Sequence, residues 1–330
     1  FIAEAIVTPV EIVKYFGEDA INAKECEIAY NATLMALLWD AVATKNARLL
    51  TRGVKNLPDK LDRATWLNYI RCHDDIGLGF SDEDIYQAGY EPRSHREFII
   101  NYFAGKFKNS SARGLLFAPN KKTNDARISG TLTSLIGLEK ALEDNDYEKI
   151  DIIIKHILLL YGIIFSFGGI PLIYYGDELG TLNDYSYIED ISKANDSRWA
   201  HRPRIDWKQA QLRKKPGTVE YKLFSALKQM IAVRKEISEF SDFNNRKLLE
   251  ISNPELFAYI RFSLSSRKSI LVVGNFDARP QYLNILEIES QGFKISENII
   301  DRYSNEIPSL FNDQLVIAPY QFYWLTNSNT

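Results

Sequence analysis

The sequence predicts an α/β domain followed by an antiparallel β domain, and two observations lead to this prediction. As far as about Ile237, short apolar runs alternate with longer stretches of helical periodicity. That alternation is typical of a parallel sheet or barrel covered by helices. After Ile237 the runs are strand-like, with no helix of convincing length between them, at residues 256–262, 270–276, 282–288, 314–317 and 321–325.

Composition places the chain among globular proteins. Of its 330 residues, 45% are hydrophobic and 25% are charged, which excludes a disordered chain and allows two domains or one large barrel with an appendage. The 40 Lys and Arg against 43 Asp and Glu give a net charge of −3, so no nucleic-acid partner is expected. Cys26 and Cys72 cannot build a disulfide scaffold and fit a reducing compartment, so we expect a cytoplasmic protein.

The α/β part is expected to hold four short strands, at residues 2–7, 27–30, 67–72 and 171–175. Helices are expected at residues 9–16, 32–50 and 220–234. Residues 77–124 look irregular and polar. Long excursions of this kind on an α/β scaffold usually serve function.

Residues 157–175 carry no charge, and their number is enough to span a bilayer. Gly168, Gly169 and Pro171 would break such a helix in its middle. The sequence therefore predicts a buried helix that ends near Phe167, a glycine turn and a short buried strand. No membrane association is expected.

Polar side chains stand inside or directly after the predicted strands, and α/β scaffolds place their ligands at the carboxyl ends of such strands. These side chains are Glu4 in the run IAEAIV, the triplet from His73 to Asp75, and Asp177 with Glu178. The last two are expected to be structural. Aromatic residues nearby are expected in the core: Trp39, Trp66, Tyr69 and Tyr174.

Glu4 and the triplet are the stronger candidates for chemistry. Burying a carboxylate in an apolar strand is costly unless it is paired or functional, so Glu4 belongs either to a structural ion pair or to a site. Adjacent acids repel, so either Asp74 or Asp75 should have a raised pKa or a specific partner. Glu4 and Asp74 on strands of one sheet suggest a carboxylate pair of the kind that acts on glycosidic bonds.

Four segments in order carry a family resemblance: IAEAIV, NYIRCHDDIG, GGIPLIYYGDELGTLND and DSRWAHRPRIDW. Together they resemble the α-amylase family (glycoside hydrolase family 13), and the last two look most like the amylosucrases of that family. The resemblance covers nearly the whole chain, from Glu4 to the β domain.

The resemblance implies a (β/α)8 barrel followed by an antiparallel all-β domain. This chain would hold the second half of the barrel, with strands five to seven in residues 1–76, an inserted loop domain in 77–131, strand eight and its flanking helices in 132–240, and the β domain in 241–330. The first four strands, and the strand-four aspartate that the family uses as nucleophile, are expected upstream. Any targeting signal would lie there too.

The resemblance also implies roles for individual residues. Glu4 would be the general acid/base, and Asp74 the acid that stabilises the transition state and binds sugar hydroxyls. His73 would hydrogen-bond the glucosyl unit beside Asp74. Arg198 resembles the arginine that pairs with an acid of the missing half and closes the pocket.

Four further residues are implied on the acceptor side. Asp75 and Arg127 match positions that contact the fructosyl unit or the acceptor, while Glu25 and Arg96 would lie further along the acceptor path. Arg127 and Arg96 would otherwise be surface arginines. No metal or cofactor is expected, because the remaining histidines show no ligand spacing.

The function that follows is retaining glucosyl transfer from sucrose to an α-1,4-glucan, with some sucrose hydrolysis, by a larger enzyme of which this chain is part. A sucrose hydrolase or another α-glucosidase of the same family is an alternative. A second alternative is a non-catalytic half-barrel that needs the missing N-terminal half. On each of these readings we expect the isolated chain to be inactive, and as an open half-barrel we expect it to aggregate or associate.

Overall fold

In the computed structural model, residues 1–5, 9–17, 24–58, 63–120, 122–123, 125–263 and 268–327 are described. The sheet of the α/β part contains β1 (Ile2–Ala3), β2 (Ile28–Tyr30), β3 (Thr65–Asn68) and β6 (Ile170–Pro171). They lie in the order β1-β2-β3-β6 and are all parallel, as predicted.

The strands are shorter than predicted. The first ends at Ala3, so the prediction that Glu4 lies within it was wrong; Glu4 follows the strand, and residues 6–7 of the predicted run lie outside the described residues. The third ends at Asn68 instead of residue 72, because its neighbour β2 ends at Tyr30. There Asn31 leaves the sheet and caps the next helix by accepting from the Leu34 amide.

The helices of this part are α1 (Pro9–Ile12) with a 3₁₀ turn (Val13–Phe16), α2 (Ala32–Thr44), α3 (Arg48–Lys55), α8 (Tyr147–Ser166) and α9 (Val219–Glu236). The single helix predicted over residues 32–50 was wrong, because Lys45 is left-handed with φ 55° and divides it. The prediction of a helix ending near Phe167 is confirmed. None of the described helices has the length and apolarity that a membrane crossing requires.

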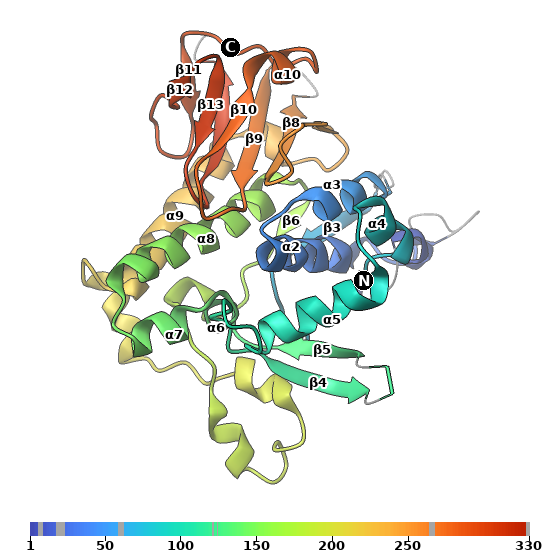
Figure 1. Ribbon diagram of the computed structural model, residues 1–330, viewed down its shortest axis with the longest axis vertical. Coiled ribbons are helices and arrows are strands. Elements are labelled where there is room, and N and C mark those ends of the chain that lie inside the picture. The colour runs from blue at the N-terminus through green and yellow to red at the C-terminus, as the bar shows by residue number, and fades with distance from the viewer. Residues whose placement is uncertain are drawn as a thin grey trace.

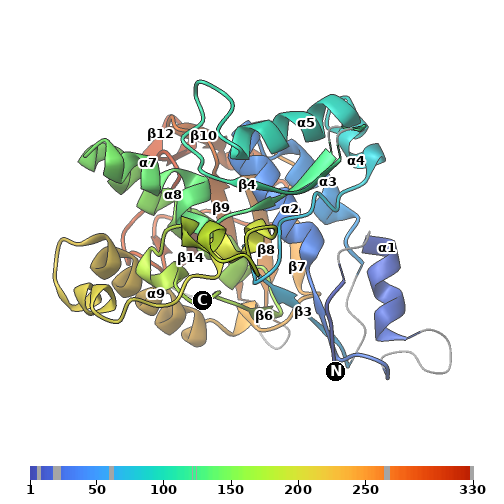
Figure 2. The same cartoon turned by 90° about the horizontal axis from the view of Figure 1, so that it is seen from below.

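The excursion after β3 is not irregular, which corrects the prediction. It contains α4 (Asp82–Gln87), α5 (Pro92–Phe103) and a hairpin of β4 (Leu115–Asn120) and β5 (Asp125–Ser129). Polar residues that suggested a loop are helix caps: Ser81 and Glu91 accept from the first amides of α4 and α5. Figure 2 shows α4, α5 and β4 together on one side of the molecule, away from α9.

Two short helices, α6 (Leu132–Ile136) and α7 (Leu138–Glu143), lead from the hairpin to α8. Between β6 and α9 the chain makes four 3₁₀ turns, at Asp177–Leu179, Tyr185–Glu189, Ser197–His201 and Gln209–Lys214. A further 3₁₀ turn, Ser238–Phe240, follows α9. Figure 1 shows the segment with the middle two turns at the end of the molecule opposite the C-terminal strands.

The C-terminal part is an antiparallel β domain, as predicted. Its larger sheet has the order β11 (Ile299–Asp301), β14 (Phe322–Asn327), β9 (Ser269–Asn275), β8 (Leu256–Phe262) and β7 (Arg246–Leu248). Its smaller sheet has the order β10 (Gln281–Asn284), β13 (Gln314–Ile317) and β12 (Leu310–Phe311). The strand predicted over 282–288 is confirmed only as far as Asn284. That residue caps a short helix, α10 (Ile285–Glu289), so the prediction for the remaining residues was wrong.

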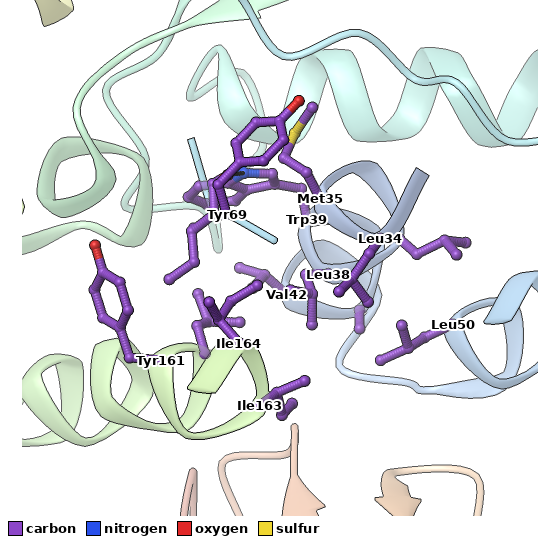
Figure 3. Packing of buried hydrophobic residues seen from close by; sticks show 14 of the residues in the cluster. Leu34, Met35, Leu38, Trp39, Val42, Leu50, Tyr69, Tyr161, Ile163 and Ile164 are labelled. Atoms are coloured by element: carbon purple, nitrogen blue, oxygen red, sulfur yellow. Dashed lines mark hydrogen bonds between the residues drawn. The ribbon is translucent and has the colours of Figure 1, made fainter. Parts of the chain in front are cut away.

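The main core lies between α2, α8 and the sheets on either side of them. Figure 3 shows Leu38 and Val42 of α2 facing Ile163 and Ile164 of α8. Trp39, Trp66 and Tyr69 are buried in this core, as predicted, whereas Tyr174 is only partly buried. A second, smaller cluster fills the space between the two sheets of the β domain.

Trp324 of β14 joins the β domain to the α/β part. Its ring is fully buried, packs edge-on against Phe240 at 5.0 Å between centroids, and donates from Nε1 to the carbonyl of Gly162 in α8 at 3.2 Å. A Cβ at position 162 would lie 2.7 Å from the ring of Phe322, so only glycine allows α8 this close to β14.

We predict that Trp324→Ala lowers the free energy of unfolding by about 3–5 kcal/mol, the usual cost of truncating a large buried aromatic side chain. Trp207→Ala is the matched control, because Trp207 is 70% exposed; its effect should stay within about 0.5 kcal/mol. Denaturant unfolding followed by circular dichroism measures both. Equal effects of the two substitutions would contradict the role given to Trp324.

Candidate active site

Three of the predicted site residues meet at the carboxyl edge of the parallel sheet. Glu4 follows β1, and His73 and Asp74 lie beyond the end of β3. The Nε2 atom of His73 lies 3.3 Å from a carboxylate oxygen of Glu4 and 3.8 Å from one of Asp74. The imidazole therefore stands between the two carboxylates that the sequence placed at one site.

The Glu4 side chain is 42% exposed, so the prediction that this carboxylate is buried was wrong. The reason is the early end of β1, which leaves Glu4 beyond the sheet. Exposure allows Glu4 to be charged without a structural partner, and it also leaves the carboxylate accessible to a ligand.

Tyr30, Tyr69 and Cys72 lie beside these carboxylates. The rings of Tyr30 and Tyr69 meet edge-to-face at 5.1 Å. Burial, followed by the charges of Glu4, Cys72 and Asp74, raises the pKa of Tyr30. Burial raises the pKa of the Cys72 thiol to about 11, so this cysteine is no nucleophile near neutral pH.

Two arginines hold the carboxylate of Asp74. Arg198 Nη1 and Arg202 Nη2 lie 3.2 and 3.3 Å from the same Oδ1 atom. Asp196 in turn binds Arg198, with Nε to Oδ1 at 3.0 Å and Nη2 to Oδ2 at 2.9 Å. The carboxylate of Asp74 is thus held from one side, while its other oxygen faces His73.

Asp75 lies beneath the arginines instead of facing solvent. Its side chain is 2% exposed, with Oδ2 3.2 Å from Arg127 Nε and Oδ1 4.0 Å from Arg198 Nη1. Burial raises the pKa of Asp75, and the charge of Arg127 opposes this. The guanidinium groups of Arg127 and Arg198 lie over the ring of Phe117, at 4.9 and 4.4 Å from its centroid. The structure thus places Arg127 and Asp75 next to Arg198, which binds Asp74.

His201 holds the backbone of His73 in place, a role that the sequence did not predict. Its Nδ1 accepts from the Gly130 amide at 3.1 Å, and its Nε2 donates to the His73 carbonyl at 3.0 Å. Arg202 Nε donates to the same carbonyl at 2.6 Å. Burial lowers the pKa of His201 to about 4, which keeps the ring neutral and suits one donor and one acceptor nitrogen.

The sequence signal for Asp196, His201 and Arg202 was the density of charged residues in the run DSRWAHRPR, from which only Arg198 was singled out. The same segment lines a cavity of about 680 Å³ beside Arg202. Its walls combine the aromatic rings of Tyr187 and Trp199 with charged side chains, among them Asp184, Lys193 and Arg204.

Asp177 lies in a buried network of hydrogen bonds, which agrees with the structural role expected for it. It is buried, accepts from Arg71 Nε at 2.7 Å and from the Tyr161 hydroxyl at 2.9 Å. Arg71 also donates to the His201 carbonyl at 3.1 Å.

Glu25 and Arg96 are not brought to the site. Glu25 precedes β2, so it stands at the amino edge of the sheet, and its amide bonds to the Phe16 carbonyl. Arg96 lies on α5, where it binds Asp82 at 2.5 Å and the Phe80 carbonyl at 2.9 Å.

No family model matches the sequence. The glucosylglycerate phosphorylase of Escherichia coli is 24% identical over 332 residues, which cover 98% of this chain and 52% of that protein. The trehalose synthase/amylase TreS of Mycobacterium tuberculosis is 24% identical over 309 residues, 86% of this chain and 44% of that protein. The chain thus spans about half the length of these curated relatives.

Solved structures show the same kind of fold. Sucrose 6F-phosphate phosphorylase from Thermoanaerobacter thermosaccharolyticum matches with a TM-score of 0.57 and 16% identity over 83% of this chain and 47% of that one. AmyP in complex with maltose matches with a TM-score of 0.60 and 11% identity over 99% of this chain and 55% of that one. These homologues and neighbours are enzymes of the α-amylase family, glycoside hydrolase family 13, whose structures are (β/α)8 barrels with a C-terminal β domain.

We predict that the protein loses stability on acidification between about pH 6.5 and pH 4, and that His201→Asn reduces this loss. Because burial lowers the pKa of His201 to about 4, the unfolded chain binds a proton in that range that the folded chain does not. The contribution is about 3 kcal/mol at most.

Unfolding midpoints measured from pH 7.5 to pH 4 test this. The slope with pH should be smaller in the variant, whatever its stability at pH 7. Some slope should remain, because burial lowers the pKa of His156 to about 3. An unchanged slope in His201→Asn would refute the assignment.

Proposed function

We propose that this chain carries the acid/base half of a retaining, glucosyl-transferring enzyme of the α-amylase family. The observation that carries the proposal is the meeting of Glu4 and Asp74 at His73 Nε2, at 3.3 and 3.8 Å, on the carboxyl edge of a parallel sheet. Active sites of barrel enzymes lie at that edge. The curated relatives, a glucosylglycerate phosphorylase and a trehalose synthase/amylase, support the same chemistry.

In the proposed mechanism Glu4 protonates the glycosidic oxygen and then, as a base, activates the acceptor. A retaining enzyme also needs a carboxylate nucleophile about 5–5.5 Å from the acid. We propose that this nucleophile comes from outside the 330 residues, on a fourth barrel strand. On this assignment β1, β2, β3 and β6 are barrel strands five to eight, and residues 77–131 form an inserted domain.

Asp74 is proposed to stabilise the cationic, oxocarbenium-like transition state, which an additional carboxylate favours electrostatically. Arg198 and Arg202 bind one of its oxygens and leave the other toward His73, so the carboxylate is held in one orientation before substrate arrives. His73 would donate to a glucosyl hydroxyl from the same place.

The proposed donor is sucrose and the proposed acceptor an α-1,4-glucan, as in the amylosucrases. The cavity beside Arg202, with Trp199 in its wall, is where an acceptor sugar could stack and hydrogen-bond. Phosphate is a second candidate acceptor. It is favoured by the arginines over Phe117 and by the phosphorylases among the similar proteins.

A non-catalytic half-barrel is the alternative from another class. The outer strands β1 and β6 of the sheet carry the exposed apolar side chains of Ile2 and Ile170, and Phe1, directly before β1, is exposed too. Such edges pair readily with another polypeptide segment. On either view the partner is a segment that completes the barrel.

We predict that Glu4→Gln, in the chain joined to the segment that supplies the nucleophile, lowers kcat/KM with sucrose by about 10²–10⁴-fold. Glu25→Gln is the matched control, since Glu25 stands at the opposite edge of the sheet, and it should leave the rate within a factor of about two. With α-glucosyl fluoride, whose leaving group needs little protonation, the loss in Glu4→Gln should shrink. A near-normal rate of Glu4→Gln with sucrose would show that Glu4 is only structural.

The donor and acceptor are tested by incubating the same complete protein with sucrose, with and without inorganic phosphate. We predict fructose release together with glucan and some glucose; glucose 1-phosphate in the phosphate arm would assign the second acceptor. The 330-residue chain alone should release no fructose. Absence of every product from the complete protein would exclude sucrose as donor.

A further inference from the structure

Three different metal-ligating atoms converge at the edge of the proposed active site. A carboxylate oxygen of Glu4, the Sγ atom of Cys72 and a ring nitrogen of His73 all lie within 4.8 Å of one another. They come from the ends of β1 and β3, which are not adjacent in the sheet. The proposed glucosyl-transfer mechanism gives the thiol of Cys72 no role.

The distances are close to those of a coordination sphere. With bonds of about 2.0–2.3 Å from zinc to oxygen, nitrogen and sulfur, tetrahedral ligand atoms lie about 3.2–3.8 Å apart. The separation of 3.3 Å between Glu4 Oε1 and His73 Nε2 is within that range. The remaining separations, up to 4.8 Å, need side-chain shifts of about 1 Å. Glu4 and His73 are both exposed and can move.

Two carboxylates stand at this edge, those of Glu4 and Asp74, and one oxygen of Asp74 is bound by Arg198 and Arg202. An oxygen of Asp74 lies 3.8 Å from His73 Nε2 and is the nearest candidate for a fourth ligand. A cysteine binds a metal ion as the thiolate, so a thiol proton is released to solvent on binding.

We propose that Glu4, Cys72 and His73 form a binding site for a divalent cation of borderline softness, of which Zn²⁺ is the type, and that the bound ion blocks the active site. The blocking part rests on the proposed function, because it requires that Glu4 acts as the acid. A metal-bound carboxylate cannot carry the proton that the leaving group needs. The thiolate and imidazole ligands exclude Mg²⁺ and Ca²⁺, which prefer oxygen.

The test uses Co²⁺ as a spectroscopic substitute for Zn²⁺ in the full 330-residue chain, so the result does not depend on turnover. Co²⁺ bound to a thiolate shows a sulfur-to-cobalt charge-transfer band in the near ultraviolet. We expect this band at one equivalent of Co²⁺, its loss on addition of Zn²⁺, and no change with Mg²⁺. Displacement of Co²⁺ by Mg²⁺ would overturn the proposal.

Variants assign the ligands. Cys72→Ser should abolish the band, and His73→Gln and Glu4→Gln should each weaken Co²⁺ binding at least about tenfold, the lower end of the loss that is typical even for outer partners of metal ligands. Cys26→Ser is the matched control and should keep the band, because Cys26 is outside the three-ligand group. His73 and Glu4 are exposed, so their variants remain informative if Cys72→Ser fails to fold.

The site would also be overturned by the absence of a charge-transfer band in the wild-type chain, or by a band that survives Cys72→Ser. In the complete, active protein, micromolar Zn²⁺ should inhibit and a chelator should restore activity. If the band behaves as expected and Zn²⁺ does not inhibit, the metal site stands and the assignment of Glu4 as the acid is wrong.

Discussion

The buried ion pair of Arg71 and Asp177 is the interaction on which the site depends. Both side chains are almost fully enclosed, and they join the segment after β3 to the turn after β6. An enclosed ion pair is tolerated only where hydrogen bonds compensate for lost hydration. Here the Tyr161 hydroxyl supplies one, and the His201 carbonyl accepts another. Arg71 stands two residues before His73, so this pair sets the path of the chain that presents His73 and Asp74.

From that anchor the site is assembled by segments far apart in the sequence. His201 and Arg202 both bind the His73 carbonyl, and Arg202 and Arg198 both bind Asp74. The hairpin of β4 and β5 contributes Phe117, whose ring lies beneath the guanidinium groups of Arg127 and Arg198. The same exposure that lets Glu4 reach a sugar also leaves it within reach of a cation, so the proposed catalytic and metal-binding properties have one physical origin.

Local signals predicted the elements where a pattern was long enough. The strand over 256–262 and the end of α8 agree with the structure because an apolar run and a glycine pair are strong signals. The sequence did not predict the helix break at Lys45, because a lysine gives no indication that its backbone will be left-handed. The helices α4 and α5 were not predicted, because their capping residues are of the polar types that are also common in loops.

The sequence by itself determined which residue types stand in or after the strands: a lone acid in the run of the first, a histidine and two acids beyond the third, and an arginine-rich run after the fourth. It could do so because a parallel sheet places all carboxyl ends at one edge, whatever the details of packing. Only the tertiary structure decided which side chains meet there. It put Glu25 at the opposite edge, tied Arg96 to Asp82, buried Asp75 and set Cys72 beside Glu4. Strand length and the paths of the connecting segments made those choices, and both follow from packing between residues distant in the chain.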